Sequence, residues 1–261
     1  AIYREWLHSS LQSYPDKEVA KNVDLVVDGY DVVDKQVYPS WKSLLAEAED
    51  GYSVVMLTGS RHSAYDTSLP FIPTLTNFVR SVATSAETQH IKVVGICFGH
   101  QLISIAMGGE CKAGEAGWEI GVYGNEVTEA GKYWWTGHWP DKEDPDRVYI
   151  QQMHRDHVPT LPPDFQILSR SNKYPIHSMV KTHPTCTPAN PRAQIFSVQG
   201  HPEYTPDIVR LMVDIRSEQG IFDKKTTAEA RRRLVGKDGS GGEGYGRVGW
   251  AIWRVLLQDT P

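Results

Sequence analysis

Residues 91–100 read Ile-Lys-Val-Val-Gly-Ile-Cys-Phe-Gly-His, an apolar run that ends in a Gly-x-Cys-x-Gly pattern. A short apolar run bounded by turn-forming residues is typical of a strand that is buried on both faces, as in a parallel sheet. A helix is expected next, over residues 100–107, because Gly108 and Gly109 follow and can end it. The stretch therefore predicts a cysteine, Cys97, at a sharp turn from a buried strand into a helix.

The sequence before this stretch supplies the other half of a βαβ unit. Residues 53–57 form a second apolar run, which ends at Thr58-Gly59-Ser60, and the apolar spacing predicts a helix over residues 73–83. Strand, helix and strand in this order indicate an α/β sheet. Three earlier elements are also expected: helices over residues 2–11 and 40–49, and a β-type run over residues 24–30.

The remainder of the chain divides into three parts. Residues 117–198 favour short strands and turns, with a last strand over 193–199, and a helix is expected over 206–218. We therefore expect one α/β domain over residues 1–235. Residues 236–246 contain six glycines and are predicted to be a flexible linker or loop. Residues 247–261 are predicted to be an amphipathic tail that docks on the core.

Composition narrows the class of protein. The chain has 261 residues, 40% of them hydrophobic, and a net charge of −5, which gives no electrostatic reason to expect nucleic acid. No apolar stretch is long enough to span a bilayer, and the first residues lack the apolar core of a signal peptide. Three cysteines without metal-type spacing favour a reducing compartment. These features predict a cytoplasmic protein without membrane or nucleic-acid partners.

The cysteine at the turn has two interpretations. A nucleophile between a strand and a helix stands clear of the sheet, and the helix N-terminus favours its thiolate. The backbone N–H of Phe98 would then point toward an oxyanion formed at the attacked carbonyl. The alternative is a small buried cysteine at an ordinary strand end.

A nucleophilic thiol needs a base, and one histidine follows a strong strand. His201 comes after the run that ends at Val198, with Glu203 two residues later. Since the carboxyl ends of parallel strands share one edge of a sheet, His201 can reach the edge that carries Cys97. Glu203 can orient the imidazole and stabilise its charged form. Together these residues form a hypothesis of a Cys97-His201-Glu203 triad.

These segments resemble the class I, or triad, glutamine amidotransferase family. Residues 96–101 (Ile-Cys-Phe-Gly-His-Gln) are similar to its nucleophile motif, and residues 199–203 (Gln-Gly-His-Pro-Glu) are similar to its His-Pro-Glu motif. The resemblance covers about residues 24–218. It implies a flavodoxin-like α/β fold, with a mixed, mostly parallel central sheet flanked by helices.

The resemblance also implies roles for further residues. Gly59 or Ser60 would supply the second oxyanion donor, and Gln101 would help to hold the glutamine substrate. Residues 152–158 look like the segment that binds the α-amino and α-carboxylate groups of the substrate, largely through backbone. Its candidate substrate-binding residues are His154, Arg155 and Asp156.

The most specific likeness is to small stand-alone members, the plant γ-glutamyl peptidases and their fungal relatives. Residues 58–66, 117–121 and 199–204 carry it. In one respect the chain differs, because family members usually open with a parallel strand and this sequence begins almost directly in the first helix. Either an N-terminal piece is missing or the sheet is one strand smaller. The segment after residue 236 has no counterpart in the resemblance.

Three functions are compatible with these motifs. The first is a γ-glutamyl peptidase that forms a γ-glutamyl thioester on Cys97 and passes it to water. The second is a glutaminase subunit that supplies ammonia to a separate synthase, and the third is a non-enzymatic regulatory protein. None needs a cofactor. We predict no metal site, because His154 and His157 lack a third ligand at close spacing.

Overall fold

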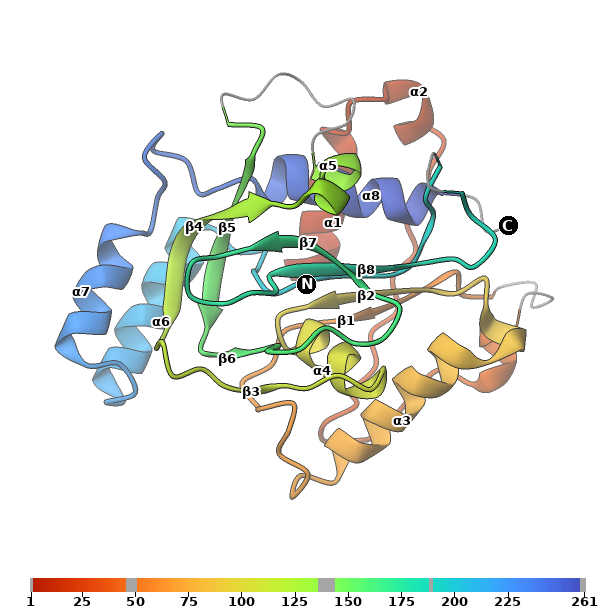
Figure 1. Ribbon diagram of the computed structural model, residues 1–261, viewed down its shortest axis with the longest axis horizontal. Coiled ribbons are helices and arrows are strands. Elements are labelled where there is room, and N and C mark those ends of the chain that lie inside the picture. The colour runs from red at the N-terminus through yellow and green to blue at the C-terminus, as the bar shows by residue number, and fades with distance from the viewer. Residues whose placement is uncertain (1, 46–50, 136–143, 188–189, 259–261) are drawn as a thin grey trace.

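In the computed structural model, which describes residues 2–45, 51–135, 144–187 and 190–258, a seven-stranded mixed sheet forms the centre of the molecule (Figure 1). Its strand order is β1-β2-β9-β8-β7-β4-β5. These strands are β1 (Val54–Leu57), β2 (Lys92–Ile96), β4 (Glu119–Val127), β5 (Arg147–His154), β7 (Gln166–Arg170), β8 (Ser178–Thr182) and β9 (Ala193–Val198). A separate ribbon joins β3 (Lys112–Ala113) to β6 (Asp156–His157).

The helices surround this sheet. They are α1 (Ile2–Gln12), α2 (Lys17–Ala20), α3 (Phe71–Thr84), α4 (Phe98–Ala106), α5 (Glu129–Trp135), α6 (Pro206–Glu218), α7 (Lys224–Arg232) and α8 (Gly249–Leu257). Shorter helical turns lie at η1 (Trp41–Leu44), η2 (Ala86–Thr88) and η3 (Gly244–Val248). None of the described helices is both long enough and apolar enough to cross a membrane.

Three parallel strands, β1, β2 and β9, determine the position of the predicted site. β2 pairs in parallel with β1 on one side and with β9 on the other, and Ile96 is the register partner of Val198. Every residue of β2 and β9 is buried, which explains their unbroken apolar runs. The residues that follow the two strands, Cys97 and the segment after Val198, therefore leave the sheet at the same edge.

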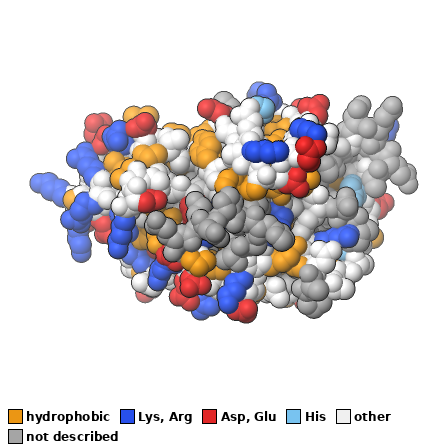
Figure 2. All heavy atoms as spheres, turned by 90° about the horizontal axis from the view of Figure 1, so that it is seen from above, with side chains coloured by type: hydrophobic (Ala, Val, Ile, Leu, Met, Phe, Trp, Pro, Cys, Tyr) orange, Lys and Arg blue, Asp and Glu red, His pale blue; other side chains and the backbone are white. Residues whose placement is uncertain are grey.

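The apolar core lies on both faces of the sheet. Successive residues of β2 point to opposite faces, so Val93 packs with α3 and α4 while Val94 packs with α1, α5 and α8. Each fully buried Val or Leu stabilises the fold by about 1.5–3 kcal/mol. α6 and α7 cover β4 and β5 at a third cluster, at the left of Figure 1. Figure 2 shows Lys and Arg side chains gathered at that same end.

The C-terminal helix lies against the N-terminal one. The Trp253 indole N–H donates to the Leu7 carbonyl at 2.9 Å, and Trp6 donates to the Gly244 carbonyl at 2.9 Å. Gly244 lies so close to the backbone of Pro202 that a Cβ added to Gly244 would be 2.2 Å from the Pro202 carbonyl oxygen. The glycine-rich segment thus has close contacts with the core at Gly244. Its flexibility stays a prediction.

Most predicted elements are confirmed, including the strands at 53–57, 91–96 and 193–199 and the helices at 2–11, 73–83, 100–107 and 206–218. The mixed sheet flanked by helices is also confirmed, but the expectation that it is mostly parallel is wrong, because two of its strand pairs are parallel and four are antiparallel. β8 pairs antiparallel with both β9 and β7, and β4 does so with both β7 and β5. The apolar content of these segments does not encode strand direction, so the expectation of a mostly parallel sheet rested on the resemblance alone.

Two predicted elements are wrong. Residues 24–30 form no strand, because no neighbouring strand pairs with them in the described structure; Val26 is 77% exposed, and an Arg4 N–H donates to the Val27 carbonyl instead. The helix expected over residues 40–49 is a single turn, η1, capped by the Ser40 side chain. Residues 46–50 of that predicted helix lie outside the described residues.

Candidate active site

Cys97 occupies the turn between β2 and α4 with φ 51° and ψ −102°, backbone angles that an L-residue rarely adopts. The turn is crowded on both sides. A Cβ added to Gly99 would lie 2.4 Å from the Leu57 carbonyl oxygen, and one added to Gly95 would lie 2.6 Å from Ile103 Cδ1. The close packing of this turn therefore requires the two glycines of the Gly-x-Cys-x-Gly pattern. Such backbone strain costs of order 1–3 kcal/mol and clusters at functional sites.

His201 and Glu203 lie beside this turn. The Cys97 backbone N–H donates to the Val198 carbonyl at 2.9 Å, which ties the two strand ends together. His201 Nδ1 lies 2.7 Å from Glu203 Oε1, and both side chains are buried. Tyr204 stacks on the imidazole, with ring centroids 4.0 Å apart and planes at 8°. The structure thus brings together the three residues of the predicted triad.

The surroundings of His201 favour its charged form. Burial lowers the pKa of the imidazole, but the Cys97 thiolate and then the Glu203 carboxylate raise it, through charge and hydrogen bonding. The rise caused by Cys97 and Glu203 together is larger than the lowering caused by burial, so the pKa of His201 lies well above its usual value. A thiolate beside an imidazolium is the reactive form of a cysteine nucleophile.

Tyr3, on α1, also contacts this group. Its hydroxyl donates to Glu203 Oε1 at 2.8 Å and accepts from the Gly59 backbone N–H at 2.9 Å. Burial and the nearby Glu203 carboxylate raise the pKa of Tyr3 far above its usual value, so the hydroxyl keeps its proton. No motif pointed to Tyr3, since it lies 200 positions from Glu203 in the sequence.

The predicted oxyanion donors lie around the same turn. Phe98 is the first residue of α4, so its N–H has no carbonyl partner within the helix. The Gly59 N–H is engaged by Tyr3, and a Cβ on Gly59 would lie 2.6 Å from His201 Cε1. The neighbouring Ser60 presents its side-chain oxygen to the His62 N–H. The Ser60 backbone N–H therefore stands beside the Gly59 N–H as a candidate for the second donor to the oxyanion.

Two glutamines connect Cys97 with the predicted substrate segment. The Gln101 side-chain amide donates to the Asp156 carbonyl at 3.0 Å and to Gln199 Oε1 at 3.2 Å. Gln199 Nε2 lies 3.7 Å from the Cys97 sulfur. The Ser63 hydroxyl donates to Asp156 Oδ2 at 2.6 Å, which fixes the same segment from the other side. Gln199 has no role among the residues predicted from the sequence, although it lies within the His-Pro-Glu motif.

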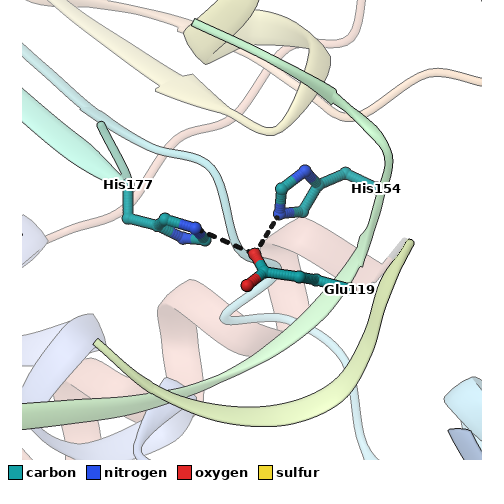
Figure 3. Close-up of side chains that lie close together, drawn as sticks. All are labelled: Glu119, His154 and His177. Atoms are coloured by element: carbon teal, nitrogen blue, oxygen red, sulfur yellow. Dashed lines mark ion pairs between the residues drawn. The ribbon is translucent and has the colours of Figure 1, made fainter. Parts of the chain in front are cut away.

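His154 lies in a buried group with Glu119 and His177 (Figure 3). Glu119 Oε2 lies 3.1 Å from His154 Nε2 and 2.9 Å from His177 Nε2. Burial would raise the pKa of Glu119, but the hydrogen bonds and charges of the two histidines hold it well below its usual value. Ser171 donates to the other carboxylate oxygen at 2.8 Å. Through its other nitrogen, Nδ1, the His154 ring is 3.0 Å from the Asp156 carbonyl.

Glu119, His154 and His177 also have the donor atoms of a metal site, because these atoms all lie within 4.8 Å of one another. Sequence spacing alone offers His157 as the partner of His154. In the structure His157 instead packs on Tyr174, with ring centroids 4.5 Å apart. Three donors are fewer than the four ligands of a closed zinc site, and the burial of all three side chains leaves no open position of the kind that a catalytic zinc site keeps. Burial also lowers the pKa of His154, which favours its neutral form. We therefore interpret this group as a buried polar network around the Glu119 carboxylate.

Comparison with known proteins gives a family model and several named relatives that this chain is similar to. The glutamine amidotransferase class-I family model matches residues 34–209. A glutamine amidotransferase-like protein of Schizosaccharomyces pombe is 29% identical over 181 residues; these cover 69% of this chain and 64% of that protein, less than two thirds of its length. Gamma-glutamyl peptidase 4 of Arabidopsis thaliana is 29% identical over 212 residues, covering 81% of this chain and 74% of the relative.

A third relative and a solved structure extend the comparison. One subunit of the glutamine-hydrolysing GMP synthase of Pyrococcus furiosus is 31% identical over 137 residues, covering 51% of this chain and 64% of the relative. The crystal structure of a glutamine amidotransferase from Thermotoga maritima superposes with a TM-score of 0.57 at 21% identity, covering 82% of each chain. At this identity the superposition shows the fold alone.

Proposed function

This chain belongs to the glutamine amidotransferase class-I family, and from that premise we propose that it hydrolyses γ-glutamyl amide bonds as a stand-alone γ-glutamyl peptidase. The observation that carries the proposal is the position of Cys97: it occupies a strained turn beside His201, whose Nδ1 lies 2.7 Å from Glu203. Similarity to a plant gamma-glutamyl peptidase over 81% of the chain supports the peptidase assignment.

The proposed first step forms a thioester. The Cys97 thiolate attacks the δ-carbonyl carbon of the γ-glutamyl group, and the carbonyl oxygen becomes an oxyanion held by the Phe98 N–H and a second N–H from Gly59 or Ser60. As the tetrahedral intermediate collapses, the carbon–nitrogen bond breaks. His201 gives its proton to the departing amine, and the γ-glutamyl group stays on the Cys97 sulfur.

The second step returns the enzyme to its starting state. Neutral His201 takes a proton from water, and the hydroxide oxygen attacks the thioester carbonyl. The carbon–sulfur bond then breaks, which releases glutamate and restores the Cys97 thiolate beside protonated His201. Glu203 holds the imidazole in the required orientation throughout. This chemistry uses no metal, nucleotide or organic cofactor.

A second candidate function is that of a glutaminase subunit, with free glutamine as substrate and ammonia passed to a separate synthase. The similarity to the Pyrococcus furiosus GMP synthase subunit favours it. A non-enzymatic regulatory role is the third alternative. It does not explain why a strained cysteine lies next to a histidine and a carboxylate.

Glutamate release by the purified protein distinguishes these functions. Free glutamine, γ-glutamyl dipeptides and glutathione conjugates are compared, with Cys97→Ala as the blank. A peptidase cleaves the peptides unaided, whereas a synthase subunit prefers glutamine or stays nearly inactive alone. Hydrolysis by a folded Cys97→Ala protein at the wild-type rate would exclude Cys97 as the nucleophile.

A further inference from the structure

Two guanidinium groups meet at the ring of Trp118, which precedes β4. Arg155 Cζ lies 5.7 Å from the ring centroid, and Arg216 Cζ, from α6, lies 5.8 Å from it. Arg216 is also 5.7 Å from the centroid of Phe222, whose ring packs edge-on against Trp118 at 4.9 Å. Two arginines from different segments of the chain thus approach one aromatic surface, the Trp118 ring.

The two arginines differ from others at this end of the molecule. On α6 and α7, Arg210 pairs with Asp207 at 2.7 Å and Arg231 pairs with Asp214 at 2.8 Å. In the part of the chain that the structure describes, no carboxylate is in ion-pair contact with Arg155 or Arg216. An anion bound near this ring would therefore be attracted by the positive charge of both guanidinium groups.

This surface lies next to the candidate active site. Trp118 and Tyr204 pack in one apolar cluster, and Tyr204 stacks on His201. Burial raises the pKa of the Tyr204 hydroxyl and the charge of Arg216 opposes that rise, as expected for a guanidinium nearby. Arg155 precedes Asp156, whose carbonyl accepts from Gln101. The pair therefore borders the His201 side of the site.

We propose that Trp118, Arg155 and Arg216 bind the carboxylate of the leaving group. The inference rests on the proposed function, in which His201 protonates the departing amine, so the leaving group lies on the His201 side. Guanidinium groups bind carboxylates through paired hydrogen bonds, and the indole ring can pack against the adjoining side chain of the substrate. The preferred substrates are then γ-glutamyl peptides with a free C-terminal carboxylate.

The test compares two leaving groups that differ only in charge, γ-glutamyl-glycine and γ-glutamyl-glycinamide. We expect wild-type kcat/KM to favour the carboxylate about tenfold to a hundredfold. Arg216→Gln should lose most of this preference through a higher KM for the carboxylate substrate, with little change for the amide. Arg210→Gln, on the same helix as Arg216 but paired with Asp207, is the control and should keep the preference.

Equal use of both substrates by wild type would overturn the inference. An equal loss on both substrates in Arg216→Gln would also overturn it, because that side chain would then bind the glutamyl part or maintain the fold. Calorimetric binding of both peptides to Cys97→Ala protein decides the subsite without turnover. Tighter binding of the carboxylate would support the subsite even if wild type hydrolysed neither peptide, a result that would overturn only the proposed function.

Discussion

Cys97, His201 and Glu203 are held by residues that the local sequence does not single out. Tyr3 is the clearest case, because its hydroxyl joins Glu203 Oε1 to the Gly59 N–H. A protonated phenol that donates to the carboxylate limits the positions the carboxylate can take, and hence those of the imidazole. We infer that Tyr3 is a positioning residue and does not itself take part in the chemistry.

Tyr3→Phe should lower kcat by about tenfold to a hundredfold with little change in KM, because it removes one neutral–charged hydrogen bond of about 1.5–3 kcal/mol. Steady-state kinetics on the preferred γ-glutamyl peptide measures this. Tyr30→Phe, which removes an exposed hydroxyl bonded to Tyr52, is the matched control. An unchanged kcat in a folded Tyr3→Phe protein would exclude the positioning role.

The raised pKa of His201 predicts a pH dependence. In the proposed mechanism His201 carries its proton when the amine departs, so kcat/KM should fall as pH rises through the pKa of His201 in the folded protein. Glu203→Gln removes one of the charges that raise this pKa, and the alkaline fall should therefore begin at lower pH. Profiles of kcat/KM against pH measure the shift, and a shift to higher pH would contradict the account.

The same pKa has a consequence for stability. A group whose pKa is raised on folding stabilises the folded state fully below its unfolded pKa, and this contribution is lost as pH rises through its folded pKa. The His201 contribution to the free energy of unfolding should therefore be larger at neutral pH than at strongly alkaline pH.

Among the elements, β2 and β9 are the pair that makes the site possible. They are neighbouring and parallel, so the Cys97 turn and the His201 turn emerge side by side. The sequence predicted both strands because each is an unbroken apolar run. It did not predict that residues 24–30 lack a partner, since strand pairing depends on distant parts of the chain. Glu119 and His177 were missed for the same reason, as they lie on separate strands or turns.

Glu119, on β4, allows a test at the level of the secondary-structure elements. Glu119→Gln replaces the buried carboxylate between His154 and His177 with a neutral amide, and we expect the free energy of unfolding to fall by about 1.5–3 kcal/mol, the range for hydrogen bonds to a charged group. Because the His154 ring contacts the Asp156 carbonyl, KM should also rise. Urea denaturation measures the first effect. Glu126→Gln, an exposed position on the same strand, should change neither quantity.

At the scale of the whole molecule, the two ends of the described chain support each other and the site. α8 packs on α1, and α1 carries Tyr3 to the triad. Residues 236–243 lie between α7 and η3, and the Glu243 backbone N–H donates to the Tyr149 carbonyl at 2.7 Å. The sequence predicted a docked tail from its apolar face. It did not indicate that the tail lies behind the helix that reaches Glu203.

Trp253→Ala should therefore affect both stability and activity. The lost indole leaves a cavity and removes the hydrogen bond to Leu7, which should lower the free energy of unfolding by about 3–5 kcal/mol. Glutamate release by the folded fraction should fall as well, because α1 loses support. Leu211→Ala, at a residue that is 61% exposed, is the control for both. Full activity in a destabilised Trp253→Ala protein would contradict the link between the tail and the site.

The central claim is that the γ-glutamyl group is carried covalently by Cys97. The most direct measurement is mass spectrometry of the Cys97 peptide after rapid acid quench of a reaction with the preferred γ-glutamyl substrate. We expect one added glutamyl group on Cys97, absent when Cys97→Ala protein is used. A glutamyl group on a different residue, or turnover at the wild-type rate by Cys97→Ala, would contradict it.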